Sequence, residues 1–365
     1  MFQGAPDLIC RHWISNVRRQ PVTAATAPGM TESPVVNPVG ASWFEDLTCE
    51  LLDECIGLGI GVVGCTANDT WDDTLETMEN LQTVKAVVRS QPHAYVLERG
   101  DQLESSPGKV GVLLGLQNPK AFSDSINFLE AFIDMGLRCA ALAFRENSYY
   151  GCGFSSPNDS GLSQIGEHAV RTMNRRGVVI DLSHVGDKTA MDAVRLSEHP
   201  AIFSHSMARE LVATGPKLEW AGVKNSFVLR AAPDELIVAA AAKGGVICPD
   251  ARIAGNLDNF LKHIDYLVKL VGADHVGVCA QDDWHRSMKD ARRIQPYLPG
   301  YDSVAGKGTR KFGARYEIYR MEDQLGPPVL AADRLGAELR RRYAEADAAK
   351  ILGGNLIRVL RAVLR

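Results

Sequence analysis

Two short polar motifs carry the residues best suited to chemistry. One reads Asp181-Leu182-Ser183-His184 and the other Ser204-His205-Ser206, and each follows a short apolar run. Imidazole is both a transition-metal ligand and a general acid or base near neutral pH. A buried histidine can equally be a structural residue whose ring nitrogens are satisfied by hydrogen bonds. The motifs therefore predict that His184 and His205 act as catalytic or metal-binding residues, with a structural role as the alternative.

Further polar and aromatic residues follow other apolar runs of the chain. Amide side chains there can bind a substrate amide or carboxylate, aromatic rings can line a pocket, and a carboxylate can assist the histidines. Each type also has a plainer role, since amides satisfy backbone groups at a rim and aromatic rings pack in cores. The candidates of this kind are Gln117, Asn118, Asn147, Tyr149, Asp282 and Trp284.

Eight apolar runs alternate with amphipathic stretches along the chain. The runs are continuous and rich in β-branched residues, which is typical of buried parallel strands, and the stretches repeat apolar residues every three or four positions, as helices do. The predicted strands are 34–36, 60–65, 110–116, 139–144, 178–182, 201–203, 245–248 and 275–279. The predicted helices are 44–57, 70–89, 122–136, 163–176, 188–197, 234–243, 257–271, 331–342 and 344–364, the last interrupted at Gly353-Gly354-Asn355.

Eight strand–helix alternations predict a TIM-like (β/α)₈ barrel. An open doubly wound sheet is the alternative, but it favours a glycine-rich loop after the first strand, and the sequence has none there. We expect one barrel domain over residues 35–365, preceded by an extended arm over 1–34, with a long loop over 299–331. Because active sites of such barrels lie at the C-terminal ends of the strands, His184 and His205 should lie close together at the mouth.

Composition narrows the classes of partner. The 365 residues include 40 basic and 44 acidic side chains, which gives a net charge of −4 and no basic excess for binding nucleic acid. No apolar stretch is long enough to cross a membrane, and no secretory signal precedes the first predicted strand. The eight cysteines form no CxxC pair and predict buried free thiols in a reducing cytoplasm. A small-molecule substrate is therefore the expected partner, and a homodimer is compatible with this kind of barrel.

Several segments resemble the membrane (renal) dipeptidase family, peptidase family M19. They span roughly residues 35–365 and comprise Gly161-Leu162-Ser163, 173–185 with the first histidine, 200–209 with the second, 263–277, and Lys350-Ile351-Leu352-Gly353-Gly354-Asn355 with Arg358-Val359. The resemblance implies a barrel of the metallo-dependent hydrolase type with a binuclear zinc site that hydrolyses dipeptides. In that family a metal-bridging hydroxide attacks a carbonyl polarised by zinc. It also implies that His184 and His205 match two strand-end metal ligands and that Arg230 binds the substrate carboxylate.

The sequence departs from the family pattern at the other ligands. A His-x-Asp pair of the family falls on Val39 and Ala41, and its bridging glutamate falls on Gln117. A histidine that binds the reaction intermediate falls on Phe144, and a strand-eight aspartate falls on Gln281. The remaining charged ligands are too few to hold two divalent metal ions. We therefore expect either no metal or one zinc-like ion on His184 and His205. Gln117 and Gln281 then become candidates for binding substrate.

Three functions are compatible with this pattern. The first is a divergent enzyme of a dedicated metabolic pathway, which acts on a small amide, amino-acid-derived or carboxylate substrate through histidine acid–base chemistry. The second is a mononuclear metal-dependent dipeptidase or amidohydrolase. The third is a non-catalytic barrel that binds a ligand. Polar replacements at Gln117 and Gln281 favour the first, because simple decay of a site more often leaves apolar residues.

Overall fold

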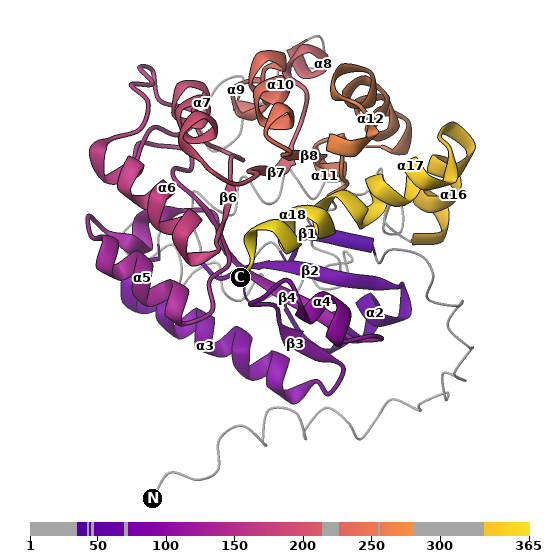
Figure 1. Cartoon of the computed structure of the whole chain (residues 1–365), viewed down its shortest axis with the longest axis horizontal. Coiled ribbons are helices and arrows are strands. Elements are labelled where there is room, and N and C mark those ends of the chain that lie inside the picture. The colour runs from indigo at the N-terminus through magenta and orange to yellow at the C-terminus, as the bar shows by residue number, and fades with distance from the viewer. Residues whose placement is uncertain are drawn as a thin grey trace, which may run out of the picture. The chain divides into compact units, whose positions relative to one another are not determined.

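The fold is built on a parallel sheet of eight strands that curls about its own interior (Figure 1). The computed structural model describes residues 35–41, 44, 47–68, 72–213, 226–254, 256–279 and 332–365. The strands are β1 (Val35–Ala41), β2 (Ile60–Thr66), β3 (Ala94–Val96), β4 (Val110–Leu116), β5 (Cys139–Ala141), β6 (Val179–Asp181), β7 (Ile202–Ser206) and β8 (Val246–Pro249).

The strands pair in the order β1-β2-β4-β5-β6-β7-β8, and all of these pairings are parallel. Residues 276–279 continue the sheet beside β8, through parallel bridges from Ile247 to Val276 and from Asp250 to Cys279. β3 and β5 pair with the same edge of β4. β3 pairs with its first residues, Val110–Val112, and β5 pairs with its last two, Gly115 and Leu116. The strands of the sheet thus correspond to the predicted strands, except for β3, which was not predicted from the sequence.

Helices surround the sheet and connect successive strands (Figure 1). The longest, α3 (Thr74–Ser90), begins at a capping box in which Asp73 and Glu76 satisfy each other's backbone N–H groups. The other described α-helices that precede residues 276–279 are α2 (Cys49–Gly57), α4 (Gln102–Ser105), α5 (Ile126–Asp134), α6 (Gln164–Arg176), α7 (Asp187–Leu196), α8 (Arg209–Ala213), α9 (Ser226–Arg230), α10 (Asp234–Ala242), α11 (Ala251–Ala254) and α12 (Leu257–Val271). The 3₁₀ turns of the described segments include η2 (Pro119–Phe122) and η3 (Ala273–His275).

The C-terminal segment of the chain crosses the centre of the ring of helices (Figure 1). It consists of α16 (Ala332–Arg342), α17 (Glu345–Ala349), the π-helical turn η5 (Lys350–Gly354) and α18 (Asn355–Val363). The predicted interruption at Gly353-Gly354-Asn355 is therefore a π-helical turn within a continuing helix. The Asn355 side chain holds this turn in place by donating to the backbone oxygens of Ala273 and Val276.

Two hydrophobic clusters divide the core. The larger one packs the outer helices against the strands. The smaller one fills the interior of the curled sheet with side chains from successive strands and closes it with α18, which adds Leu356, Val359, Leu360 and Val363. The strand residues of this interior cluster include Val36, Val39, Val62, Leu113, Cys139, Val179, Ile202, Val246, Cys248 and Cys279. Such a filled interior leaves the strand ends as the place for chemistry.

Several expectations fall outside the described residues. The arm over 1–34 and the loop over 299–331 are among them, so the predicted domain boundaries stay predictions. The cysteines in the described segments are free, and all but Cys49 are buried, as expected. Within the same segments, no helix combines the length and apolar character that crossing a membrane requires. The cytoplasmic location stays a prediction.

Candidate active site

His184 and His205 meet at the ends of neighbouring strands. β6 pairs with β7 through Asp181 and Ile202, so the residues after Asp181 lie beside the end of β7. The Nε2 atoms of the two imidazoles are 2.7 Å apart, which is hydrogen-bond distance. His184 has a φ of 67°, in the left-handed region, which costs a non-glycine residue about 1 kcal/mol. This conformation turns the chain sharply after β6 at the histidine contact.

A buried carboxylate lies behind the pair. Ser204 Oγ is 2.5 Å from Asp181 Oδ2 and 2.7 Å from His205 Nδ1. The backbone N–H groups of Ser183 and Ser204 donate to Asp181 Oδ1 over 3.0 and 3.1 Å. Burial raises the pKa of Asp181, and the hydrogen bonds from Ser204 and Ser183 act in the opposite direction. Asp181 is therefore connected to His205 through the Ser204 hydroxyl.

Aromatic rings bury His184. The ring of Phe144 lies 4.3 Å from the imidazole and that of Phe154 lies 5.9 Å away, measured between centroids. The Phe154 N–H donates to the His184 carbonyl and to that of Phe144, which holds the loop after β5 against the turn after β6. As a result, His184 is only 3% exposed and His205 is fully buried.

Arg230 lies beside His205, at the end of α9. Its guanidinium donates to the His205 carbonyl over 3.3 Å and lies 3.6 Å from Asp250 Oδ2, at the end of β8. Both charged side chains are buried. The structure thus places Arg230 at the strand ends beside the histidines, and its predicted role in binding a substrate carboxylate stays a prediction.

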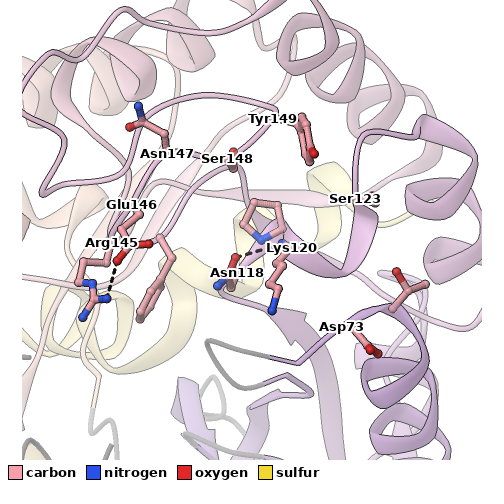
Figure 2. Close-up of a pocket in the computed structure, with 12 residues that line it drawn as sticks. Asp73, Asn118, Lys120, Ser123, Arg145, Glu146, Asn147, Ser148 and Tyr149 are labelled. Atoms are coloured by element: carbon pink, nitrogen blue, oxygen red, sulfur yellow. Dashed lines mark hydrogen bonds and ion pairs between the residues drawn. The ribbon is translucent and has the colours of Figure 1, made fainter. Parts of the chain in front are cut away.

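A cavity of about 670 Å³ opens over the ends of β4 and β5 (Figure 2). Asn147 and Tyr149 lie on one side of it and Asn118 with Lys120 on the other, so three of the predicted substrate-binding residues line one space. Two cations line it as well, Lys120 and Arg145, the latter paired with Glu146. Its wall includes Phe144, whose ring contacts His184.

A family model described as "Membrane dipeptidase (Peptidase family M19)" matches residues 49–290, more than half of the chain. The chain belongs to the membrane dipeptidase family. It is 24% identical to rat Dipeptidase 3 over 314 residues, which cover 82% of this chain and 54% of that relative. It is 28% identical to Dipeptidase tcpJ of Claviceps purpurea, covering 70% of this chain and 52% of that protein. The chain thus spans about half the length of these curated relatives.

Solved structures show the same fold. An amidohydrolase from Pseudomonas aeruginosa matches with a TM-score of 0.68 and 23% identity, over 91% of this chain and 97% of its own. A metallo peptidase from Rhodobacter sphaeroides, liganded with a phosphinate mimic of the dipeptide L-Ala-D-Ala, matches with a TM-score of 0.63 and 16% identity, over 91% and 99% of the two chains. The predicted TIM-like barrel of the metallo-dependent hydrolase type is confirmed.

Val39 and Gln117, which the resemblance predicts at two ligand positions of the family, offer no charged group to a metal ion. Val39 is a buried apolar residue of the interior cluster, and Gln117 donates from its amide to Thr66 Oγ1 over 2.9 Å. Both line an internal space of about 10 Å³, room for about one water molecule. Within the described segments, no three His, Cys, Asp or Glu side chains converge as a metal site requires. Gln281, Asp282 and Trp284 lie outside these segments, so their predicted roles stay predictions.

Several residues of this site were not predicted from the sequence. Ser204 and Ser183 were not among the candidates, although they directly precede the two histidines and could have been found from that position. Lys120 and Arg145 were also missed, because a cation near a strand end is indistinguishable in sequence from any solvated surface charge.

Proposed function

We propose that this chain is a dipeptidase-like enzyme of the amidohydrolase type that acts on a small amide, amino-acid-derived or carboxylate substrate in a dedicated metabolic pathway. In this proposal His184 and His205 do acid–base work in place of a binuclear zinc centre. The observation that carries it is the 2.7 Å contact between their Nε2 atoms. This is a hydrogen-bond distance, so the two imidazoles can share a proton.

The pair is arranged to hold and transfer a proton. In the neutral pair, one proton lies between the two Nε2 atoms. One other ring nitrogen carries no proton and can accept one from a substrate. Burial keeps water away from both imidazoles, so a proton taken from a substrate is not exchanged with solvent at once. The adjoining cavity supplies amides and cations to position a carboxylate or amide, and Phe144 both lines the cavity and contacts His184.

Two measurements test this proposal. Protein purified without chelators is analysed for metal and screened for consumption of dipeptides, N-acyl amino acids and other small amides, with and without added zinc. We expect substoichiometric zinc and a turnover that zinc does not raise. Two zinc ions per chain together with zinc-dependent dipeptide hydrolysis would refute the proposal.

A variant pair tests the histidines directly. His184→Ala should lower kcat by about 10²–10⁴-fold, the usual contribution of a general acid or base. His168→Ala is the matched control, because His168 is exposed on α6. Equal activity in the two variants would exclude His184 from the chemistry.

A further inference from the structure

We infer that Ser204 and Asp181 are positioning residues that determine which ring nitrogen of His205 carries the proton. The inference rests on the proposed acid–base function and assigns the groups that orient the pair. Ser204 Oγ makes two short contacts, with Asp181 Oδ2 and with His205 Nδ1. Because a hydroxyl has a single proton to donate, at most one of these contacts is a donation by Ser204.

The backbone around Asp181 decides the direction. Burial raises the pKa of Asp181, whereas the two backbone N–H groups that Oδ1 accepts are obligatory donors that stabilise the ionised carboxylate, and the inference takes this ionised form. An ionised carboxylate has no proton to give, so the Ser204 hydroxyl donates to Oδ2. The same hydroxyl oxygen must then accept a hydrogen bond from His205, and the proton of that ring lies on Nδ1.

The tautomer of His205 also determines the tautomer of His184. With its proton on Nδ1, the neutral His205 imidazole presents a lone pair at Nε2. His184 Nε2–H then donates across the 2.7 Å contact, and the basic nitrogen of the pair becomes Nδ1 of His184. Asp181, through Ser204, thus determines which atom of the neighbouring histidine can accept a proton. No bond is made or broken in setting this arrangement.

Asp181→Asn gives a sharp test because the geometry forces one orientation of the new amide. The two backbone N–H groups at the Oδ1 position require the amide oxygen there, so the NH₂ group must occupy the Oδ2 position. The NH₂ group donates to Ser204, whose hydroxyl then donates to His205 Nδ1. The substitution should therefore move the His205 proton from Nδ1 to Nε2, with almost no change in side-chain volume. Loss of the correct tautomer by an Asp-to-Asn change is known for the Ser-His-Asp triad.

The measurement is nitrogen NMR of the full chain labelled with ¹⁵N in its histidines, with the His205 signals assigned from a His205→Gln variant. In the wild type we expect a protonated Nδ1 and an unprotonated Nε2. Asp181→Asn should reverse this pattern, Ser204→Ala should remove the wild-type preference, and Ser204→Thr, which keeps the hydroxyl, should restore it. A wild-type His205 with its proton on Nε2, or a pattern unchanged in Asp181→Asn, would overturn the inference.

Ser206→Ala is the matched control for Ser204→Ala. The two serines flank His205 on β7 and are both buried, but the Ser206 hydroxyl donates to the Arg230 carbonyl and not to an imidazole. Ser206→Ala should therefore leave the His205 signals as in the wild type. If it alters them as Ser204→Ala does, the effect is general packing and the inference is wrong.

Turnover separates this inference from the proposed function. On whichever substrate the screen above identifies, Asp181→Asn should lower kcat by about a hundredfold or more with a smaller change in KM. If the tautomer reverses while kcat is unchanged and His184→Ala is inactive, the positioning role is refuted and the acid–base function stands. If His184→Ala is fully active, the proposed function fails, whatever the NMR pattern shows.

Discussion

His263 should make the stability of this barrel depend on pH. It lies on α12 with 2% of its surface exposed, and its Nδ1 atom has no hydrogen-bond partner among the described residues. Burial lowers the pKa of its imidazole from 6.5 to about 4. The unfolded chain therefore binds a proton near pH 6.5 that the folded chain resists until about pH 4, so the free energy of unfolding falls as the pH is lowered through this window.

The size of the effect follows from the two pKa values. At about pH 8 neither state is protonated at His263, and the residue makes no pH-dependent contribution. At about pH 5 the unfolded chain is mostly protonated and the folded chain mostly is not, which lowers the free energy of unfolding by about 2 kcal/mol; the full effect below pH 4 is about 3 kcal/mol.

Urea unfolding at about pH 8 and about pH 5 measures this contribution. His263→Leu removes the titrating group, so its loss of stability between the two pH values should be about 2 kcal/mol smaller than that of the wild type. Carboxylates titrate in both proteins and cancel in the comparison. His93→Leu, at an exposed position, should lose as much as the wild type. If wild type and His263→Leu lose equal stability, the imidazole is not buried in its neutral form and the reasoning is refuted.

Two further substitutions probe the site and the sheet. Phe144→Ala removes a ring that contacts His184 and lines the cavity, so diethyl pyrocarbonate should modify His184 several-fold faster, as read by peptide mass spectrometry; an unchanged rate would show that Phe144 does not shield it. Gly64→Ala would place a Cβ atom 1.8 Å from the Pro38 carbonyl oxygen, so β1 must move, and thermal unfolding should show a loss of about 1–3 kcal/mol. A melting temperature equal to that of the wild type would contradict the close approach of these strands.

Much of the fold could be predicted from local sequence. The run 110–116 is found as β4 with the same bounds, because a short continuous apolar stretch is typical of a strand buried on both faces. The predicted first residues of the helices were less accurate. The helix predicted from residue 44 begins at Cys49, where Thr48 caps it, and the one predicted from residue 70 begins at Thr74, after the capping box. β3 was missed because its three residues are only partly buried and carry no strong apolar signal.

The site could be predicted only in outline. The histidines follow apolar runs, so their place at the strand ends could be read from the sequence. Their contact could not, because it depends on the register of β6 against β7 and on the left-handed backbone at His184. The role of Ser204 depends on a hydrogen bond to Asp181 across two strands, and no spacing along the chain encodes such a bond.

The interior cluster explains how a family of metal-dependent enzymes can include a chain with this ligand set. Ions that bind only the folded state stabilise it by mass action, so a protein that loses them must recover that stability elsewhere. Here Val39, which the resemblance predicts at a ligand position of the family, joins the apolar interior that α18 closes, where burying a valine contributes about 1.5–3 kcal/mol. This packing stabilises the barrel from its interior and does not require an ion at the strand ends.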